Sequence, residues 1–128
     1  MVNMTKPRVL VLTGYGINCD IETELAFDLA GADAERVHIN DLIDGYRRMG
    51  EYQVLALPGG FSFGDDIGSG KVLANKMRYK LGEEVQRFAE ADKLIIGICN
   101  GAQAAIKYGL VPAFDGYGVQ EATLTFND

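Results

Sequence analysis

The chain has 128 residues, slightly less than one domain of typical size, about 150 residues. Apolar residues make up 48% of it and charged residues 23%, a balance typical of a folded globular protein. Its 18 acidic and 12 basic residues give a formal net charge of −6, and its basic residues form no block longer than the pair Arg47 and Arg48. These values argue against general binding of nucleic acid or of an anionic membrane. We therefore expect one domain, residues 1–128.

The sequence also bears on the compartment and on the cysteines. Its apolar runs are far shorter than the roughly 20 residues of a membrane-spanning helix. The first seven residues lack the apolar core of a signal peptide, so we expect a cytoplasmic protein. Two cysteines, Cys19 and Cys99, do not make a disulfide framework in that setting. Either thiol is therefore a candidate for a reactive residue.

Three short runs rich in Leu and β-branched residues predict strands at 9–12, 54–57 and 94–98, and a weaker pattern predicts a fourth at 34–39. All except 34–39 alternate poorly and are expected to be buried on both faces. Helical patterns lie between the strands, at 21–30, at 73–88 and at 100–108 before Gly109. Residues 119–126 alternate like a further strand.

This alternation of strands and helices predicts an α/β fold of three layers, flavodoxin-like, with a mostly parallel sheet and helices on both faces. Functional residues of such sheets gather at the carboxyl ends of the strands. The segments to search are therefore 13–18, 40–41, 58–70 and 99–101.

Two glycine-rich segments resemble phosphate-binding loops but lack required residues. After Gly14-Tyr-Gly16, the third glycine of a dinucleotide fingerprint would fall on Cys19. For Gly68-Ser-Gly-Lys71, the first glycine of a P-loop would fall on Asp65, and Val72 replaces the Ser or Thr that binds magnesium. We expect no nucleotide at either loop, and no metal or cofactor.

Residues 94–103, LIIGICNGAQ, carry the strongest chemical pattern. A strand runs into G-x-C-x-G and then a helix, the layout of a nucleophile elbow with Cys99 in place of serine. Gly97 and Gly101 permit a sharp reversal and close packing of strand and helix. The helix dipole would favour the thiolate of Cys99, and the N–H of Asn100 would face an oxyanion. A small buried side chain is the alternative for Cys99, but it does not account for the two glycines.

A second segment, Pro58–Asp66, leaves the strand that precedes the elbow strand. Consecutive strands are commonly neighbours, so Gly59 and Gly60 can turn another N–H toward the elbow and complete an oxyanion hole. A simple exit turn is the alternative. Cys19 stands at a helix start without flanking glycines, and we predict a structural role for it, with a second reactive thiol as the alternative.

Three segments together resemble a known family: LPGGFSFGD at 57–65, GICNGAQ at 97–103 and GINCD at 16–20. They are similar to the class I, triad-type glutamine amidotransferases, and among these to the glutaminase subunits of phosphoribosylformylglycinamidine synthase in purine biosynthesis. The resemblance extends over nearly all of the chain in order. It implies that the chain holds the N-terminal portion of such a domain.

The resemblance also implies a reaction. Cys99 attacks the side-chain amide of glutamine, and N–H groups of Gly60 (or Gly59) and Asn100 hold the oxyanion. Ammonia leaves, and water hydrolyses the thioester; Gln103 helps to hold the glutamine. The implied partners are the synthetase subunit, which uses ATP to make formylglycinamidine ribonucleotide, and its small bridging subunit. No cofactor is implied for this chain.

The triad is where the sequence departs from that family. The family's cysteine works with a His and a Glu that come later in the chain, whereas the single histidine here, His38, comes earlier. With a strand order 2-1-3-4, His38 would lie three strands from the elbow strand, roughly 14 Å at ~4.8 Å per strand. We therefore expect a structural role for His38, and we assign no triad role to Glu121. The expected domain is truncated and catalytically incomplete by itself.

Two other interpretations remain open. The chain could be a non-catalytic subunit that docks on the synthetase. It could also be a cysteine-elbow protein of the deglycase and intracellular-protease superfamily, although those proteins often have His where this chain has Asn100.

Overall fold

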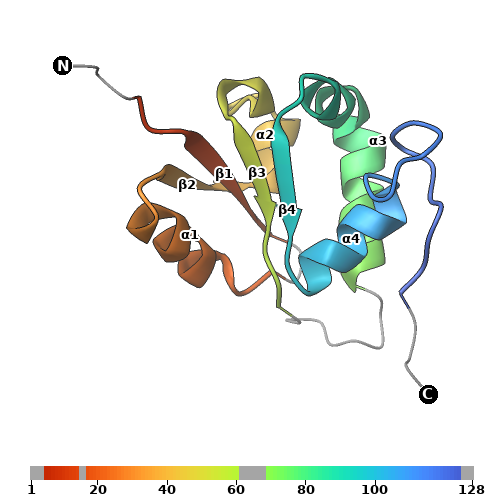
Figure 1. Cartoon of the computed structure of the whole chain (residues 1–128), viewed down its shortest axis with the longest axis horizontal. Helices are drawn as coiled ribbons and strands as arrows, with labels where there is room; N and C mark the ends of the chain where they lie inside the picture. Colours follow the sequence, from red (N-terminus) through yellow and green to blue (C-terminus); the bar gives the residue numbers. More distant parts are fainter. Residues whose placement is uncertain (1–4, 15–16, 61–68, 125–128) are drawn as a thin grey trace.

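A computed structural model describes residues 5–14, 17–60 and 69–124, and for 69–71 the backbone alone (Figure 1). Its strands are β1 (Arg8–Thr13), β2 (Asp33–His38), β3 (Val54–Leu57) and β4 (Leu94–Gly97). Its helices are α1 (Asp20–Leu29), α2 (Ile39–Ile43), α3 (Ser69–Glu90) and α4 (Asn100–Tyr108), with a 3-10 turn η1 (Met49–Glu51). The strands form one sheet in the order β2-β1-β3-β4, and every neighbouring pair is parallel.

The sheet separates two apolar cores, because alternate residues of a strand point to opposite faces. Helix α1 covers one face, where Phe27 packs against a small core on β1 and β3 (Figure 1). Helices α2, α3 and α4 cover the other face with a larger core, which includes Leu10, Leu12, Leu55, Leu57, Met77 and Val85. The predicted α/β fold of three layers is thus confirmed, as is the strand order 2-1-3-4.

Most predicted elements agree closely with the structure. The strand at 54–57 and the helix at 100–108 have the predicted bounds, and Gly109 ends that helix in the left-handed conformation, with φ 96°. Elements α2 and η1 were not predicted, because runs of five and three residues are too short to show helical periodicity.

The prediction of burial on both faces is wrong for β4. Leu94 is 69% exposed, and Ile96 and Ile98 are each 43% exposed. Strand β4 lies at one end of the described sheet, whereas α1 packs on β1 and β2 at the other end (Figure 1). Among the described residues, no helix covers this face of β4.

The strand predicted at 119–126 is also absent over residues 119–124, and residues 125–126 lie outside the described ranges. A strand needs a neighbour for its backbone hydrogen bonds. Here residues 118 and 119 instead lie against Gly109 at the end of α4, where the N–H of Gly118 donates to the carbonyl of Gly109 at 3.2 Å. Local alternation of side chains was therefore a misleading signal.

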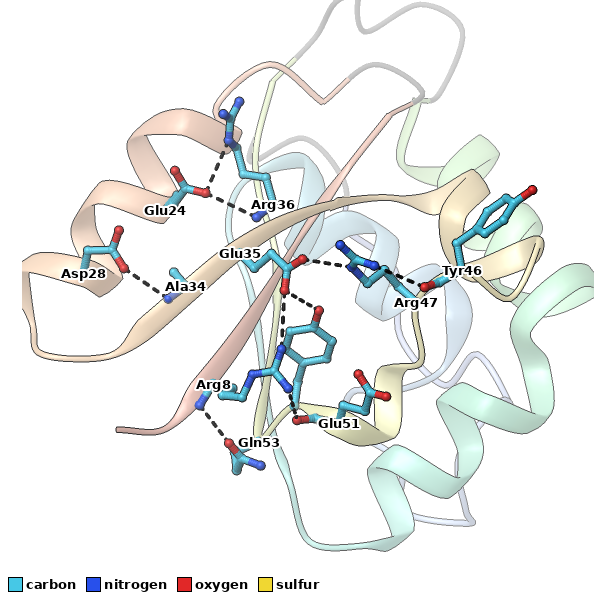
Figure 2. Close-up of polar contacts among 11 residues, drawn as sticks. Arg8, Glu24, Asp28, Ala34, Glu35, Arg36, Tyr46, Arg47, Glu51 and Gln53 are labelled. Carbon is cyan, nitrogen blue, oxygen red and sulfur yellow. Dashed lines mark hydrogen bonds and ion pairs between the residues drawn. The ribbon is translucent and has the colours of Figure 1, made fainter. Parts of the chain in front are cut away.

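The edge strand β2 is held by side chains. The N–H groups of Ala34 and Arg36 donate to the carboxylates of Asp28 and Glu24 on α1, at 3.1 and 3.2 Å (Figure 2). Free N–H groups on an edge strand would otherwise invite pairing with another chain. These two carboxylates therefore close the β2 edge of the sheet.

A polar cluster around Glu35 ties β2 to the segment before β3 (Figure 2). Its carboxylate accepts from the hydroxyl of Tyr52 at 2.7 Å and from Nε of Arg47 at 2.9 Å, and it pairs with Arg8 at 3.5 Å. The hydrogen bond from Tyr52 lowers the pKa of Glu35, and burial raises the pKa of Tyr52 to about 12. At neutral pH the pair is therefore a carboxylate acceptor and a neutral phenol donor.

None of the helices in the described ranges is both long and apolar enough to cross a membrane.

We predict that Glu35→Gln lowers the free energy of unfolding by about 1 kcal/mol at pH 7. Hydrogen bonds to charged groups contribute about 1.5–3 kcal/mol, and solvent screening reduces that value for a side chain that is 35% exposed. Because folding lowers the pKa of Glu35 from its ordinary value of 4.5, this stabilisation is complete above that value and is lost as the pH falls through the folded-state pKa. Urea unfolding over a pH series measures it.

Tyr52→Phe is the matched control, because it removes the hydrogen bond from the Tyr52 hydroxyl to Glu35 and keeps the buried ring. If wild type and Glu35→Gln differ in free energy of unfolding by the same amount at every pH, the carboxylate of Glu35 is not the source of the stabilisation.

Candidate active site

The turn between β4 and α4 has the backbone geometry of an elbow. Cys99 adopts φ 55° and ψ −113°, in the positive-φ region that non-glycine residues rarely occupy. Such a conformation costs about 1–3 kcal/mol and persists only where the surrounding packing enforces it. The side chain of Cys99 is exposed. The strained turn therefore presents a thiol to solvent at the start of a helix.

Two glycines explain how this turn is enforced. A Cβ on Gly101 would overlap the carbonyl oxygen of Leu57 in β3, and a Cβ on Gly97 would lie 2.7 Å from the carbonyl oxygen of Gly101. Helix α4 thus crosses β3 and β4 with backbone in contact with backbone. Any side chain at either position would push the helix away from the sheet.

The turn after β3 lies directly against the cysteine. A Cβ on Gly59 would lie 3.0 Å from Cβ of Cys99 and 3.9 Å from its Sγ. Gly60 follows with φ +128°, a conformation that strains any other residue. The fold thereby brings together the two segments that the sequence singled out. The rest of that motif, residues 61–66, lies outside the described residues.

Asn100 and Gln103 occupy the first turn of α4. Asn100 is fully buried, and Gln103 is half-buried with its N–H donating to the carbonyl of Cys99 at 3.1 Å. The first N–H groups of a helix point out of its N-terminus, where they favour negative charge. Cys99 stands at that end of α4.

The other candidate groups have local roles. Nδ1 of His38 accepts from the N–H of Asn40 at 3.0 Å, so His38 caps α2, at the opposite edge of the sheet from β4. The carboxylate of Glu121 accepts from the N–H groups of Phe114 and Asp115, at 2.6 and 3.0 Å. Each side chain therefore stabilises a nearby turn or helix end.

Sequence reasoning missed how closely Asn18 and Cys19 approach the site. Their N–H groups both donate to the carbonyl oxygen of Gly59, at 3.4 and 3.1 Å. The signal that could have found this contact is the position of the two segments, after the adjacent strands β1 and β3.

Within the described part of the chain, no group of three or more His, Cys, Asp or Glu residues could hold a metal ion. The two broken phosphate-loop motifs lie partly outside the described residues, at positions 15, 16 and 68.

This site has an exposed cysteine on a strained strand-to-helix turn, and a glycine pair after the neighbouring strand β3 faces it. These features define a class of α/β proteins with a nucleophile elbow. This chain belongs to the family of CobB/CobQ-like glutamine amidotransferase domains, whose model matches residues 6–128. That match supports the amidotransferase interpretation over the deglycase one.

Among curated proteins, the chain is similar to phosphoribosylformylglycinamidine synthase subunit PurQ from Dehalococcoides mccartyi, with 53% identity over 125 residues, 98% of this chain and 49% of the relative. The same subunit from Methanococcus maripaludis is 49% identical over 123 residues, 94% of this chain and 45% of the relative. A chain in the solved structure of PurLQS from Thermotoga maritima matches with a TM-score of 0.70 and 36% identity, over 85% of this chain and 47% of that one. The chain thus spans about half the length of the relatives it matches.

We predict opposite effects for alanine at two helical glycines. Gly101→Ala should lower the free energy of unfolding by about 2–3 kcal/mol, since its Cβ overlaps the backbone of Leu57. Gly82→Ala in α3 is the control, because a Cβ there meets nothing within 4 Å and should stabilise by about 0.5–1 kcal/mol. Urea unfolding of both variants tests the contact. Equal effects of the two substitutions would show that α4 does not touch β3 in this way.

Proposed function

We propose that this chain supplies the nucleophile and the oxyanion donors of a glutaminase that serves phosphoribosylformylglycinamidine synthase. One observation carries the proposal: Cys99 is held at φ 55° on an elbow, in contact with the turn at Gly59. Membership of the amidotransferase family and 53% identity to a PurQ subunit give it further support.

In the proposed reaction, the thiolate of Cys99 attacks the side-chain amide carbon of glutamine and forms a C–S bond. The carbonyl oxygen becomes an oxyanion, which the N–H groups of Gly60 and Asn100 stabilise. The C–N bond then breaks, and the nitrogen takes a proton and leaves as ammonia. Water hydrolyses the thioester to glutamate and restores the thiol. Gln103, one helical turn beyond Cys99, is proposed to help hold the glutamine.

In the proposed reaction, His38 is not the general base. The single histidine of the chain caps α2, three strand positions from β4, and is too distant to take a proton from Cys99. The family pattern pairs the cysteine with a later His and Glu, so the chain by itself should form a thioester with an activated substrate but should turn over glutamine poorly.

The proposed partners are a synthetase subunit, which consumes the ammonia, and a small bridging subunit. The solved structure of PurLQS from Thermotoga maritima, a complex that contains a similar chain, supports this proposal. A cytoplasmic location remains a prediction.

We predict that the chain releases one equivalent of p-nitrophenolate in a burst from the γ-(p-nitrophenyl) ester of L-glutamate. This leaving group needs no acid, and the helix dipole favours the thiolate of Cys99, so acylation does not depend on a histidine as acid or base. Cys99→Ala should abolish the burst, whereas Cys19→Ala should still release one equivalent, because its thiol is not the proposed nucleophile. Absorbance at the p-nitrophenolate band and the mass of the acylated peptide measure both.

The β-(p-nitrophenyl) ester of L-aspartate, shorter by one methylene group, is the control for recognition of glutamine. An equal burst rate with both esters, or acylation of Cys19 in place of Cys99, would refute the proposed function.

A further inference from the structure

Resting on the proposed function, we propose that Asn18 and Thr23 are positioning residues, which aim the N–H of Gly60 by fixing the Gly59–Gly60 peptide from the start of α1.

The carbonyl oxygen of Gly59 is held by two donors. The N–H groups of Cys19 and Asn18 lie 3.1 and 3.4 Å from it. The peptide that joins Gly59 to Gly60 is trans, so its C=O and N–H point in opposite directions. With the carbonyl directed at residues 18 and 19, the N–H of Gly60 is directed to the other side of the turn. Rotation of this peptide would break both hydrogen bonds.

Thr23 anchors the donor segment to the helix. Its side chain is buried, with 8% exposure, and its hydroxyl donates to the carbonyl oxygen of Cys19 at 2.7 Å. The N–H of Thr23 donates to the same oxygen at 3.2 Å. Cys19 is the N-cap residue of α1, so these two bonds hold its backbone against the first turn of the helix. A buried hydroxyl is thus used to fix a backbone segment that contacts the active-site turn.

The side chain of Asn18 holds the turn from its other end. A Cβ on Gly60 would overlap Oδ1 of Asn18 and would lie 2.5 Å from its backbone nitrogen. The thiol of Cys19 donates to that same Oδ1 at 3.4 Å. Asn18 therefore packs directly on Gly60, and Cys19 supports Asn18. These contacts account for Cys19 as a structural residue beside the reactive one.

A fixed peptide matters because an oxyanion donor acts only if it is aimed before the charge develops. The hydrogen bonds to the carbonyl of Gly59 and the packing of Asn18 on Gly60 favour one orientation of this peptide. Weakening those contacts should slow reactions that pass through an oxyanion and leave others unchanged.

The test compares two reactions of Cys99 in the 128-residue chain. Acylation by p-nitrophenyl acetate passes through a tetrahedral oxyanion, whereas alkylation by iodoacetamide does not. Thr23→Val removes the hydroxyl and should slow the acylation by about tenfold, less than the roughly 100-fold or greater cost of losing an oxyanion donor outright. Alkylation of Cys99, followed by peptide mass, should stay within about twofold of wild type. Thr23→Ser keeps a hydroxyl and should restore the acylation.

Asn18→Ala provides a second variant, since Asn18 is exposed and its truncation does not touch the core. It should give the same selective loss of acylation. If both variants acylate at the wild-type rate, or if acylation and alkylation fall equally, the inference is overturned. Acetylation requires no recognition of glutamine, so the two tests can fail independently. If the variants lose acetylation selectively but the wild-type chain gives no burst with the glutamyl ester, the proposed function is refuted and this inference is not.

Discussion

The contact of α4 with β3 at Gly101 is the constraint on which the site depends. The backbone of the helix lies so close to Leu57 that a Cβ at position 101 has no room. That approach fixes where α4 begins, and it forces the turn before α4 into the positive-φ conformation of Cys99. It also sets the distance between the cysteine and the turn that leaves β3. A change of one methyl group here would therefore alter both the stability of the fold and the geometry of its chemistry.

The two ends of the sheet contrast in ways that bear on this site. Carboxylates from α1 cap the N–H groups of β2, and the cluster around Glu35 ties that strand to the rest of the fold. Strand β4 has no such cover in the described part of the chain, and Leu94 and Ile96 are exposed on it. The strained elbow thus follows an edge strand with exposed apolar side chains, and the packing of α4 holds it in place.

The segments that follow β1, β3 and β4 meet at the turn of Cys99, each in contact with the next. The turn after β3 lies against Cys99, and residues 18 and 19, which follow β1, hold that turn by its carbonyl. In the proposed mechanism these contacts prepare an oxyanion site before charge develops on the substrate.

Motif spacing predicted the elbow well, because a cysteine with glycines on both sides at a strand end is typical of a sharp strand-to-helix turn. The central strands were equally predictable, since their apolar runs are too short and too rich in branched residues for helices. The composition of β4 predicts the same burial as that of β1 and β3. Its exposure depends on its position in the sheet, which composition does not encode. The strand expected over 119–124 is absent for a related reason. Alternation of apolar and polar side chains favours an extended backbone, but it does not show whether a neighbouring strand is present to pair with it.

Local spacing was enough to predict the order of the four strands and of the three longer helices, the α/β class, the family and the cysteine that carries the pattern. Only the packing of the strands brings residues 18 and 19 to the turn at Gly59 and leaves His38 at the opposite edge of the sheet from Cys99. The hydrogen bonds from residues 18 and 19 to Gly59 join segments about 40 residues apart, and their geometry follows from the packing of parallel strands and from the trans peptide. No local pattern in the chain specifies which carbonyl an amide will meet across the sheet.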